Sequence, residues 1–272
     1  MRQILLSCLF IFSICQVLYA QDSVPAINND SVNITITEGD SAFEKAIAAY
    51  NDGDFREAID LLEAEKEVQL ANGFESAELY YNMGNAYFRV NDIAHARLNY
   101  ERALLLDPGD RDIRHNIDYV LTKIEDKILV ADTFFLNIWF KAVQNLFSSD
   151  TWAFIAVASF LFFMVCLVVF FFSRHVPVKK IAFYIGIVSV VVVIFANVFT
   201  FGQKSRIEHR DTAVIMAGSA PVVSSPDINS KELFILHAGT KVEITKEDRN
   251  WLEIEIDNGS IGWIQREKLE II

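Results

Sequence analysis

The sequence has no cysteine in either of its polar parts. Its three cysteines are Cys8 and Cys15, close to the N-terminus, and Cys166, inside an apolar run. The polar parts therefore hold neither a disulfide framework nor a thiolate metal site. The five histidines stand far apart and none belongs to an HExxH pair, so we predict no metal site and no cofactor.

Catalytic motifs are also missing. The chain has no GxSxG nucleophile elbow, no P-loop and no GxGxxG dinucleotide motif. Carboxylates are abundant, as they are on any solvated acidic helix face, and no pair of them stands out. We assign no catalytic residue and predict that the protein is not an enzyme.

Positive charge is scarce, with 24 Lys and Arg against 36 Asp and Glu and a net charge of -12. Most of the excess acid lies in residues 21–150, where 24 acids face 11 bases. An acidic surface repels phosphate groups, so we predict no nucleic-acid partner.

Charge is completely absent from two long runs, 151–172 and 181–201. About twenty helical residues cross a hydrocarbon core of about 30 Å, and core helices of soluble domains rarely lack every charge at this length. We therefore predict two transmembrane helices. The loop between them, 173–180, reads SRHVPVKK and carries three cations and no acid, which is typical of a short cytoplasmic loop.

The N-terminus has the layout of a secretory signal peptide, predicted over 1–20. Arg2 precedes a short apolar stretch, and Ala20 offers a small residue before a polar segment. Lipidation at Cys15 and an uncleaved anchor are the alternatives. Residues 21–40 are polar and short of helix formers, so we predict a linker there.

Residues 77–110 resemble a tetratricopeptide repeat. The resemblance rests on the small residues Gly84 and Ala96, which let two antiparallel helices approach closely, and on Pro108, which ends the second helix. Tyr80, Met83, Tyr87, Tyr100 and Ala103 also stand at the expected places. A weaker copy precedes this repeat and an amphipathic capping segment follows it, so we predict a repeat array with its cap over 41–128.

A tetratricopeptide array binds its ligands in a groove lined by the first helix of each hairpin. We predict that this groove contains seven residues: Glu78, Tyr81, Asn82, Asn85, Phe88, Arg89 and, from the capping helix, Asn116. Asn side chains there can hold a peptide backbone, while Tyr81 and Phe88 offer apolar contact. A merely solvated surface is the alternative.

Two further segments complete the chain. Residues 132–148 form an amphipathic helix, which either lies on the membrane surface or packs against the array. After a linker predicted over 202–210, residues 211–272 alternate in short β-rich runs and resemble a bacterial SH3-like barrel, with Trp251 and Trp263 at expected places.

The sequence thus predicts a multidomain membrane protein with an all-α tetratricopeptide array, a two-helix transmembrane hairpin and an all-β SH3-like barrel. This order resembles the E-type protein of the Bacteroides aerotolerance (Bat) operon. The resemblance implies an envelope protein that acts with von Willebrand A-domain partners and a MoxR-type ATPase, in stress tolerance.

With the leader exported, we predict an inner (cytoplasmic) membrane location, with the repeat domain and the SH3-like domain both on the periplasmic side. The favoured function is a scaffold or adaptor that contacts membrane lipid and binds proteins. The alternative is an anchor whose SH3-like domain binds peptidoglycan. An enzyme or transporter subunit would need an ionisable group inside a span, and neither run has one.

Overall fold

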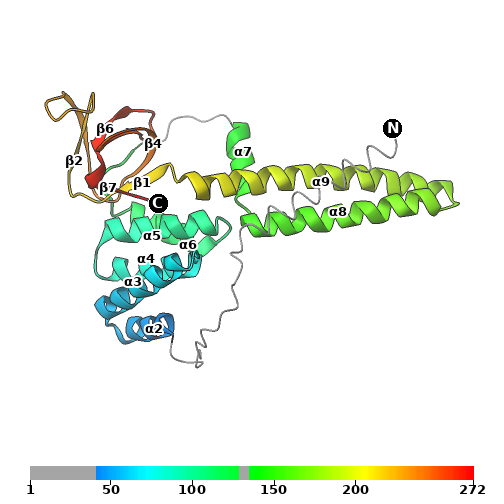
Figure 1. The fold of residues 1–272 in the computed structure, drawn as a ribbon, viewed down its shortest axis with the longest axis horizontal. Coiled ribbons are helices and arrows are strands. Elements are labelled where there is room, and N and C mark those ends of the chain that lie inside the picture. Colours follow the sequence, from blue (N-terminus) through cyan, green and yellow to red (C-terminus); the bar gives the residue numbers. More distant parts are fainter. Residues whose placement is uncertain (1–40, 129–134) are drawn as a thin grey trace.

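The computed structural model describes residues 41–128 and 135–272. The predicted signal peptide (1–20), the linker (21–40) and the start of the segment 132–148 lie outside the described residues. A helical array and a β-sheet lie together at one end of the molecule, and two long helices project from them (Figure 1).

The array consists of two helical hairpins and one further helix. Its helices are α2 (Ala42–Asp52), α3 (Phe55–Ala71), α4 (Ala77–Arg89), α5 (Ile93–Leu106) and α6 (Arg111–Leu121). At four of the five helix starts, a side-chain oxygen accepts a hydrogen bond from a backbone N–H. These oxygens belong to Ser41, Ser76, Asp92 and Asp110. Each of these caps satisfies a donor that has no partner within the helix, so the sequence itself sets where the helices begin.

The α4–α5 hairpin depends on the small size of Gly84. A Cβ atom at Gly84 would lie 2.6 Å from ring carbons of Tyr100, which is closer than packed atoms allow. The apolar faces of α2 to α6 meet in one core, whose buried members include Ala46, Leu62, Leu79, Tyr80, Met83, Ala96, Tyr100, Ile113, Ile117 and Val120. The helix α6 covers the α5 side of this core, as expected of a cap.

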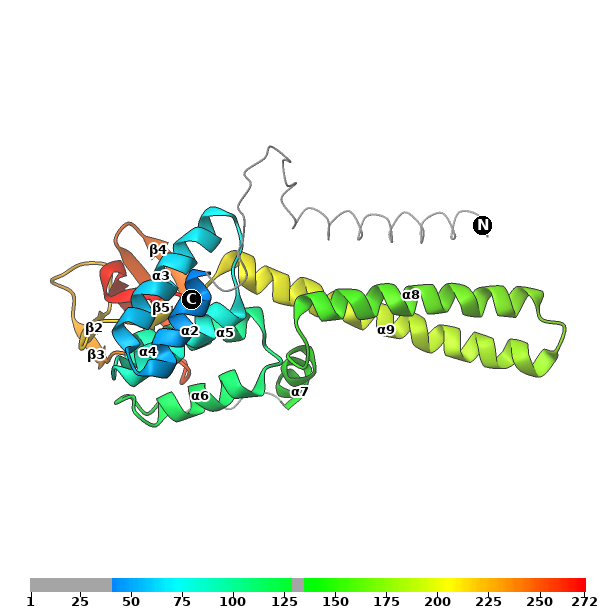
Figure 2. The ribbon, with the colours of Figure 1, turned by 90° about the horizontal axis from the view of Figure 1, so that it is seen from below.

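Two long helices follow the short helix α7 (Phe135–Gln144). They are α8 (Ser149–Phe172) and α9 (Val176–His209), which pack against each other as a hairpin (Figure 2). In the part of the chain that the structure describes, these two helices are long and apolar enough to cross a membrane by length and composition.

The helix α9 is longer at both ends than the apolar run 181–201. It begins at Val176, so Pro177 lies in the first turn of the helix and not in the loop. A proline there costs nothing, because the N–H that it lacks would have no partner within the helix. It also continues through 202–210, predicted as a linker, as far as His209. The segment after Gly202 contains good helix formers such as Gln, Lys, Arg and Glu, so the end of the apolar run does not end the helix.

The C-terminal domain is a seven-stranded antiparallel sheet. Its strands are β1 (Thr212–Ile215), β2 (Ala220–Val223), β3 (Glu232–Leu236), β4 (Lys241–Asp248), β5 (Trp251–Glu255), β6 (Ile261–Gln265) and β7 (Leu269–Ile271). They pair in the order β3-β2-β6-β5-β4-β1-β7, so the sheet is open, with β3 and β7 at its edges. The prediction of a barrel is wrong in this respect.

The geometry of the two edges explains why the sheet stays open. The strand β7 has only three residues, and the Arg102 side chain of α5 donates to the carbonyl oxygen of Ile271 at 2.7 Å. The strand β2 pairs with β6 at a single position, Val223 with Trp263, and turns away with β3. The array therefore meets one edge, while the β2–β3 ribbon diverges at the other.

The array and the sheet pack directly against each other (Figure 1). Leu98 of α5 forms a buried cluster with Val214 of β1 and the C-terminal Ile272. Parts of the chain that precede and follow the α8–α9 hairpin therefore meet at the same end of it.

Candidate functional site

The predicted groove residues divide into two groups. Tyr81 and Asn85 of α4 and Asn116 of α6 come together, with Phe88 of α4 and Tyr119 of α6 beside them. The rings of Phe88 and Tyr119 meet edge to face, with centroids 5.4 Å apart. We name these five residues the α4–α6 face.

A hydrogen-bond network joins the two helices across this face. The amide nitrogen Nδ2 of Asn116 donates to Asn85 Oδ1 at 3.0 Å and to the Tyr81 hydroxyl at 3.2 Å. The buried Tyr100 of α5 donates its hydroxyl to the same Asn85 oxygen at 2.7 Å. Burial raises the pKa of Tyr100 well above its ordinary value, so this hydroxyl keeps its proton and remains a donor.

The network uses only half of each asparagine amide. Asn85 accepts through Oδ1 and Asn116 donates through Nδ2, and no residue that the structure describes bonds to Asn85 Nδ2 or Asn116 Oδ1. Both side chains are half-buried. The face therefore has one unused donor, Asn85 Nδ2, and one unused acceptor, Asn116 Oδ1. A peptide group, which has one acceptor and one donor, could bond to both.

The other three predicted residues are placed differently. Asn82 donates to the carbonyl oxygen of Glu78 on its own helix at 2.9 Å, and Glu78 is exposed in the first turn of α4. The guanidinium of Arg89 lies 4.1 Å from the ring centroid of Phe55, in the preceding hairpin. The structure thus brings three of the seven residues into one network and leaves these three outside it.

Sequence reasoning did not assign Tyr100 or Tyr119 to the binding face. The sequence identified Tyr100 only as one of the residues at the expected places of the repeat, and its hydroxyl is the donor that orients Asn85. Tyr119 follows Asn116 by three residues on α6, so both project from the same side of that helix. That spacing is the signal that could have identified it.

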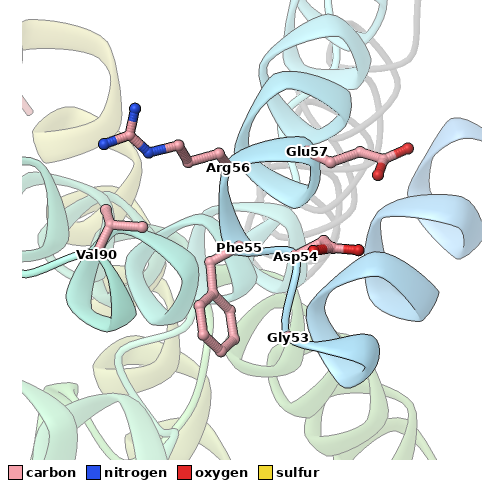
Figure 3. A pocket seen from close by; sticks show the side chains of 6 residues that line it. All are labelled: Gly53, Asp54, Phe55, Arg56, Glu57 and Val90. Carbon is pink, nitrogen blue, oxygen red and sulfur yellow. The ribbon is translucent and has the colours of Figure 1, made fainter.

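A pocket of about 490 Å³ lies at the α2–α3 turn, away from the network (Figure 3). Its lining includes Phe55, Arg56 and Val90, with Arg56 extending toward the Val90 side. Asp54 and Glu57 point to the opposite side. The positively charged and negatively charged side chains thus point in opposite directions. The pocket therefore does not bring together polar groups that could act in catalysis. Within residues 41–128 and 135–272, no group of three or more His, Cys, Asp or Glu residues could hold a metal ion.

The array–sheet interface contains a buried carboxylate, Glu101 of α5, which is 5% exposed. Lys241 of β4 donates to its Oε2 at 2.7 Å, and Arg97 lies 2.5 Å from its Oε1. Burial alone would raise the pKa of Glu101, but the two cations outweigh it and hold that pKa below its ordinary value. Glu101 is therefore ionised and links the array to the sheet electrostatically.

A second polar link joins the end of the array to the β3–β4 turn. Asp126 accepts three hydrogen bonds there: from the backbone N–H of His237 at 2.7 Å, from the ring of His237 at 2.7 Å and from the Thr240 hydroxyl at 2.6 Å. Burial opposes ionisation of Asp126, yet the bonds from Thr240 and His237 hold its pKa below the ordinary value. The hydrogen bond to Asp126 raises the pKa of His237.

Two further ion pairs extend this interface. Arg102 donates to Glu270 of β7 at 3.0 Å, and Arg210, at the end of α9, donates to Glu75 before α4 at 2.6 Å. The array, the sheet and the end of α9 are therefore held together by several contacts between residues distant in the sequence.

Comparison with known protein families identifies both modules. Residues 77–110 match the tetratricopeptide repeat family. Residues 219–270 match the family described as bacterial SH3 domain. Both modules that the sequence predicted are thereby confirmed, and domains of both kinds are typically non-catalytic interaction domains. A search of curated proteins found none that matches the chain.

The tetratricopeptide repeat consists of α4 and α5, and the bacterial SH3 domain contains β2 to β6 in full. The same repeat therefore contributes residues to two surfaces, the α4–α6 face and the array–sheet interface. Its first helix carries Tyr81 and Asn85, and its second helix carries Leu98 and Glu101, which face the sheet.

Proposed function

We propose that the protein is a non-enzymatic, membrane-anchored adaptor whose α4–α6 face binds an extended segment of a partner protein. The observation that carries this proposal is the unused amide pair, Asn85 Nδ2 and Asn116 Oδ1. A peptide group can accept from the first and donate to the second, while Tyr119, which is 49% exposed, contacts its side chains.

The anchor of this adaptor is the α8–α9 hairpin, which we propose crosses the inner membrane twice. The basic residues Arg174, Lys179 and Lys180 lie at the closed end of the hairpin, far from the array and the sheet, which supports a cytoplasmic position for that end. The contact between array and sheet supports a common compartment for both. With an exported N-terminus, that compartment is the periplasm.

The binding proposal is tested by a substitution of the same size that removes the donor and adds a negative charge. Asn85→Asp keeps the oxygen that Tyr100 and Asn116 donate to, but it replaces the outward nitrogen by an acceptor. Because hydrogen bonds of this kind contribute about 1–1.5 kcal/mol, we expect peptide affinity to fall about tenfold. Asn82→Ala, which removes a bond within α4 only, is the matched control.

The ligand for that measurement comes from site-specific photo-crosslinking in cells. A benzophenone side chain at Tyr119 should capture a polypeptide in the wild-type background and in Asn82→Ala, and should lose it in Asn85→Asp. The captured segment, made as a peptide, is then titrated against the purified full chain. Capture that is unchanged in Asn85→Asp would refute binding at this face.

The resemblance to the Bat E-type protein suggests which partners to test first. We propose von Willebrand A-domain proteins encoded nearby and a role in aerotolerance or a related envelope stress response. Co-purification of such a domain with wild-type protein, and its loss in Asn85→Asp, would support this assignment. Equal recovery with both proteins would contradict it.

The sheet favours a second candidate function, binding of peptidoglycan. Leu233 and Ile235 of β3 and Ile261 of β6 are 46%, 44% and 50% exposed, and all three lie within the residues that match the bacterial SH3 domain. Sedimentation of the detergent-solubilised full chain with purified sacculi separates the two functions. A pure adaptor stays in the supernatant, whereas a cell-wall anchor sediments and is released by Ile235→Ser.

A further inference from the structure

The short helix α7 has one packed face and one exposed apolar face. Phe140 and Val143 pack toward the base of the hairpin, where the rings of Phe140 and Phe199 lie 5.1 Å apart. On the other side, Ile138 and Trp139 are 56% and 62% exposed. We name this side, formed by Ile138 and Trp139, the α7 outer face.

Polar contacts fix α7 against the hairpin. The Gln144 side chain is 3% exposed; its Nε2 donates to the carbonyl oxygen of Phe199 at 3.3 Å, and its Oε1 accepts from Arg206 at 2.7 Å. Its carbonyl oxygen accepts from the Trp152 indole at 2.9 Å and from Gln203 at 2.7 Å. These contacts set the angle between α7, α8 and α9.

A close approach of α7 to α9 completes this clamp. A Cβ atom at Gly202 would lie 2.5 Å from the Gln144 side-chain nitrogen, so a larger residue there would displace the Gln144 amide from its position between α7 and α9. The orientation of α7 is therefore built into the fold.

The orientation itself is the second observation. The helix α7 runs across the axis of the hairpin in Figure 1 and is seen nearly end-on in Figure 2. It crosses α9 at Phe199 to Gln203, where the uncharged run ends; Lys204 and Arg206 follow immediately. If the hairpin stands upright in a membrane, this level is the boundary between acyl chains and water, and α7 lies in the membrane plane.

We propose that the α7 outer face is a lipid-binding surface, inserted about 5–10 Å into the headgroup and acyl boundary of the bilayer that the hairpin crosses. This inference rests on the proposed membrane anchoring. Trp139 has the amphipathic ring that favours this boundary, and the exposed polar residue Asn137, two positions before it, projects from the opposite side of α7. The occupant is the lipid itself, because α7 crosses the hairpin at the end of its exposed apolar part, and Leu146 and Phe147, between α7 and α8, are also 55% and 43% exposed.

This surface also determines where the array stands. Arg114 of α6 donates to the carbonyl oxygen of Asn145 at 2.7 Å, and a Cβ atom at Gly109 would lie 2.8 Å from the carbonyl oxygen of Leu146. The α5–α6 turn therefore rests on the junction between α7 and α8. If α7 lies at the boundary between lipid and water, this contact holds the first turn of α6 beside the membrane surface. The nearer end of the α4–α6 face then also lies beside the membrane.

The test uses nitroxide labels on the full chain in lipid nanodiscs, at cysteines introduced one at a time after Cys8, Cys15 and Cys166 are replaced. The labelled positions are Ile138 on the outer face and Asn137 on the opposite side. Leu161 of α8, 60% exposed, serves as the membrane reference, and Lys246 of β4, 68% exposed in its side chain, as the aqueous reference. Collision rates with oxygen, which partitions into lipid, and with a water-soluble nickel chelate are compared.

We expect the label at Ile138 to collide more with oxygen than with nickel, with a ratio between those of the two references, and the label at Asn137 to show the reverse. An aqueous ratio at Ile138 beside a lipid ratio at Leu161 would overturn this inference and leave the membrane anchor intact. Protection of Ile138 from both reagents would also overturn it, because protein would then cover the face. An aqueous ratio at Leu161 would overturn the anchor and this inference together.

Discussion

Replacing Lys241 by methionine tests whether the buried charge of Glu101 holds the array and the sheet together. Lys241 and Arg97 are the two cations that contact this carboxylate, and Lys241 is the one contributed by the sheet. Methionine keeps most of the length of the side chain and its apolar contacts. The variant therefore leaves Glu101 at the interface with one cation, contributed by its own helix.

The expected loss follows from the exposure of the two partners. Removing one partner of a fully buried ion pair costs about 3–5 kcal/mol, because the remaining charge stays desolvated. Glu101 is 5% exposed, but the Lys241 side chain is 37% exposed, so water already screens part of the pair. Since Arg97 also remains in place, we expect a loss of about 2 kcal/mol in the free energy of unfolding.

Urea unfolding of the full chain in detergent micelles measures this loss, with the near-ultraviolet circular dichroism of the aromatic side chains as the signal. The matched control is Lys246→Met on the same strand, β4. Lys246 lies 2.8 Å from Glu253 and its side chain is 68% exposed, so water screens this ion pair and we expect a much smaller loss for this variant. The two variants remove the same charge from the same strand and differ in the exposure of the lysine side chain, which is 37% for Lys241 and 68% for Lys246.

A double-mutant cycle supplies the decisive comparison. In a Glu101→Gln background the carboxylate is gone, so Lys241→Met should cost much less than it does in the wild-type chain. An equal cost in both backgrounds would refute the coupling between these residues. A cost no larger than that of Lys246→Met would show that the buried charge does not stabilise the interface.

Two other changes have expected outcomes that follow from the geometry. Asp126 has a lowered pKa, so its stabilising effect is lost as pH falls through that pKa; His237 has a raised pKa, so its effect is lost as pH rises through it. The urea concentration at the unfolding midpoint should therefore be highest between about pH 4 and pH 6.5. If this concentration depended on pH as steeply in His237→Gln as in the wild type, the expectation would be contradicted. Gly84→Ala should destabilise the array by about 1–3 kcal/mol through its clash with Tyr100, whereas unchanged thermal unfolding would show that the two helices can separate without cost.

Local patterns in the sequence predicted the elements that depend on local chemistry. The spacing of small and aromatic residues in 77–110 requires two closely packed helices, and Gly84 does lie against Tyr100. The two uncharged runs likewise gave the central parts of α8 and α9. The ends of α9 were not predicted, because an apolar run marks where lipid can surround a helix and says little about where its backbone hydrogen bonding stops.

Tertiary contacts account for what the sequence did not predict. Arg97 and Glu101 have the four-residue spacing of ion pairs on solvated helix faces, and their burial comes from the packing of the sheet against α5. On the α4–α6 face, the structure joins Tyr81, Asn85 and Asn116, three of the residues that the repeat register predicted for the groove, in one hydrogen-bond network. That register does not specify side-chain direction, so it did not predict that Arg89 would turn toward the preceding hairpin, where aromatic rings attract its charge.

The array–sheet interface also has a consequence for how the chain is made. Glu101 and Asp126 leave the ribosome before α8, whereas His237 and Lys241 follow α9, so the two halves of the interface are synthesised on either side of the hairpin. If the hairpin crosses a membrane twice, as we propose, a chain with one crossing too few would hold the two halves in different compartments, and Glu101 would lack Lys241. On that proposal, closure of the interface, and the stability that it adds, would depend on correct insertion of both helices.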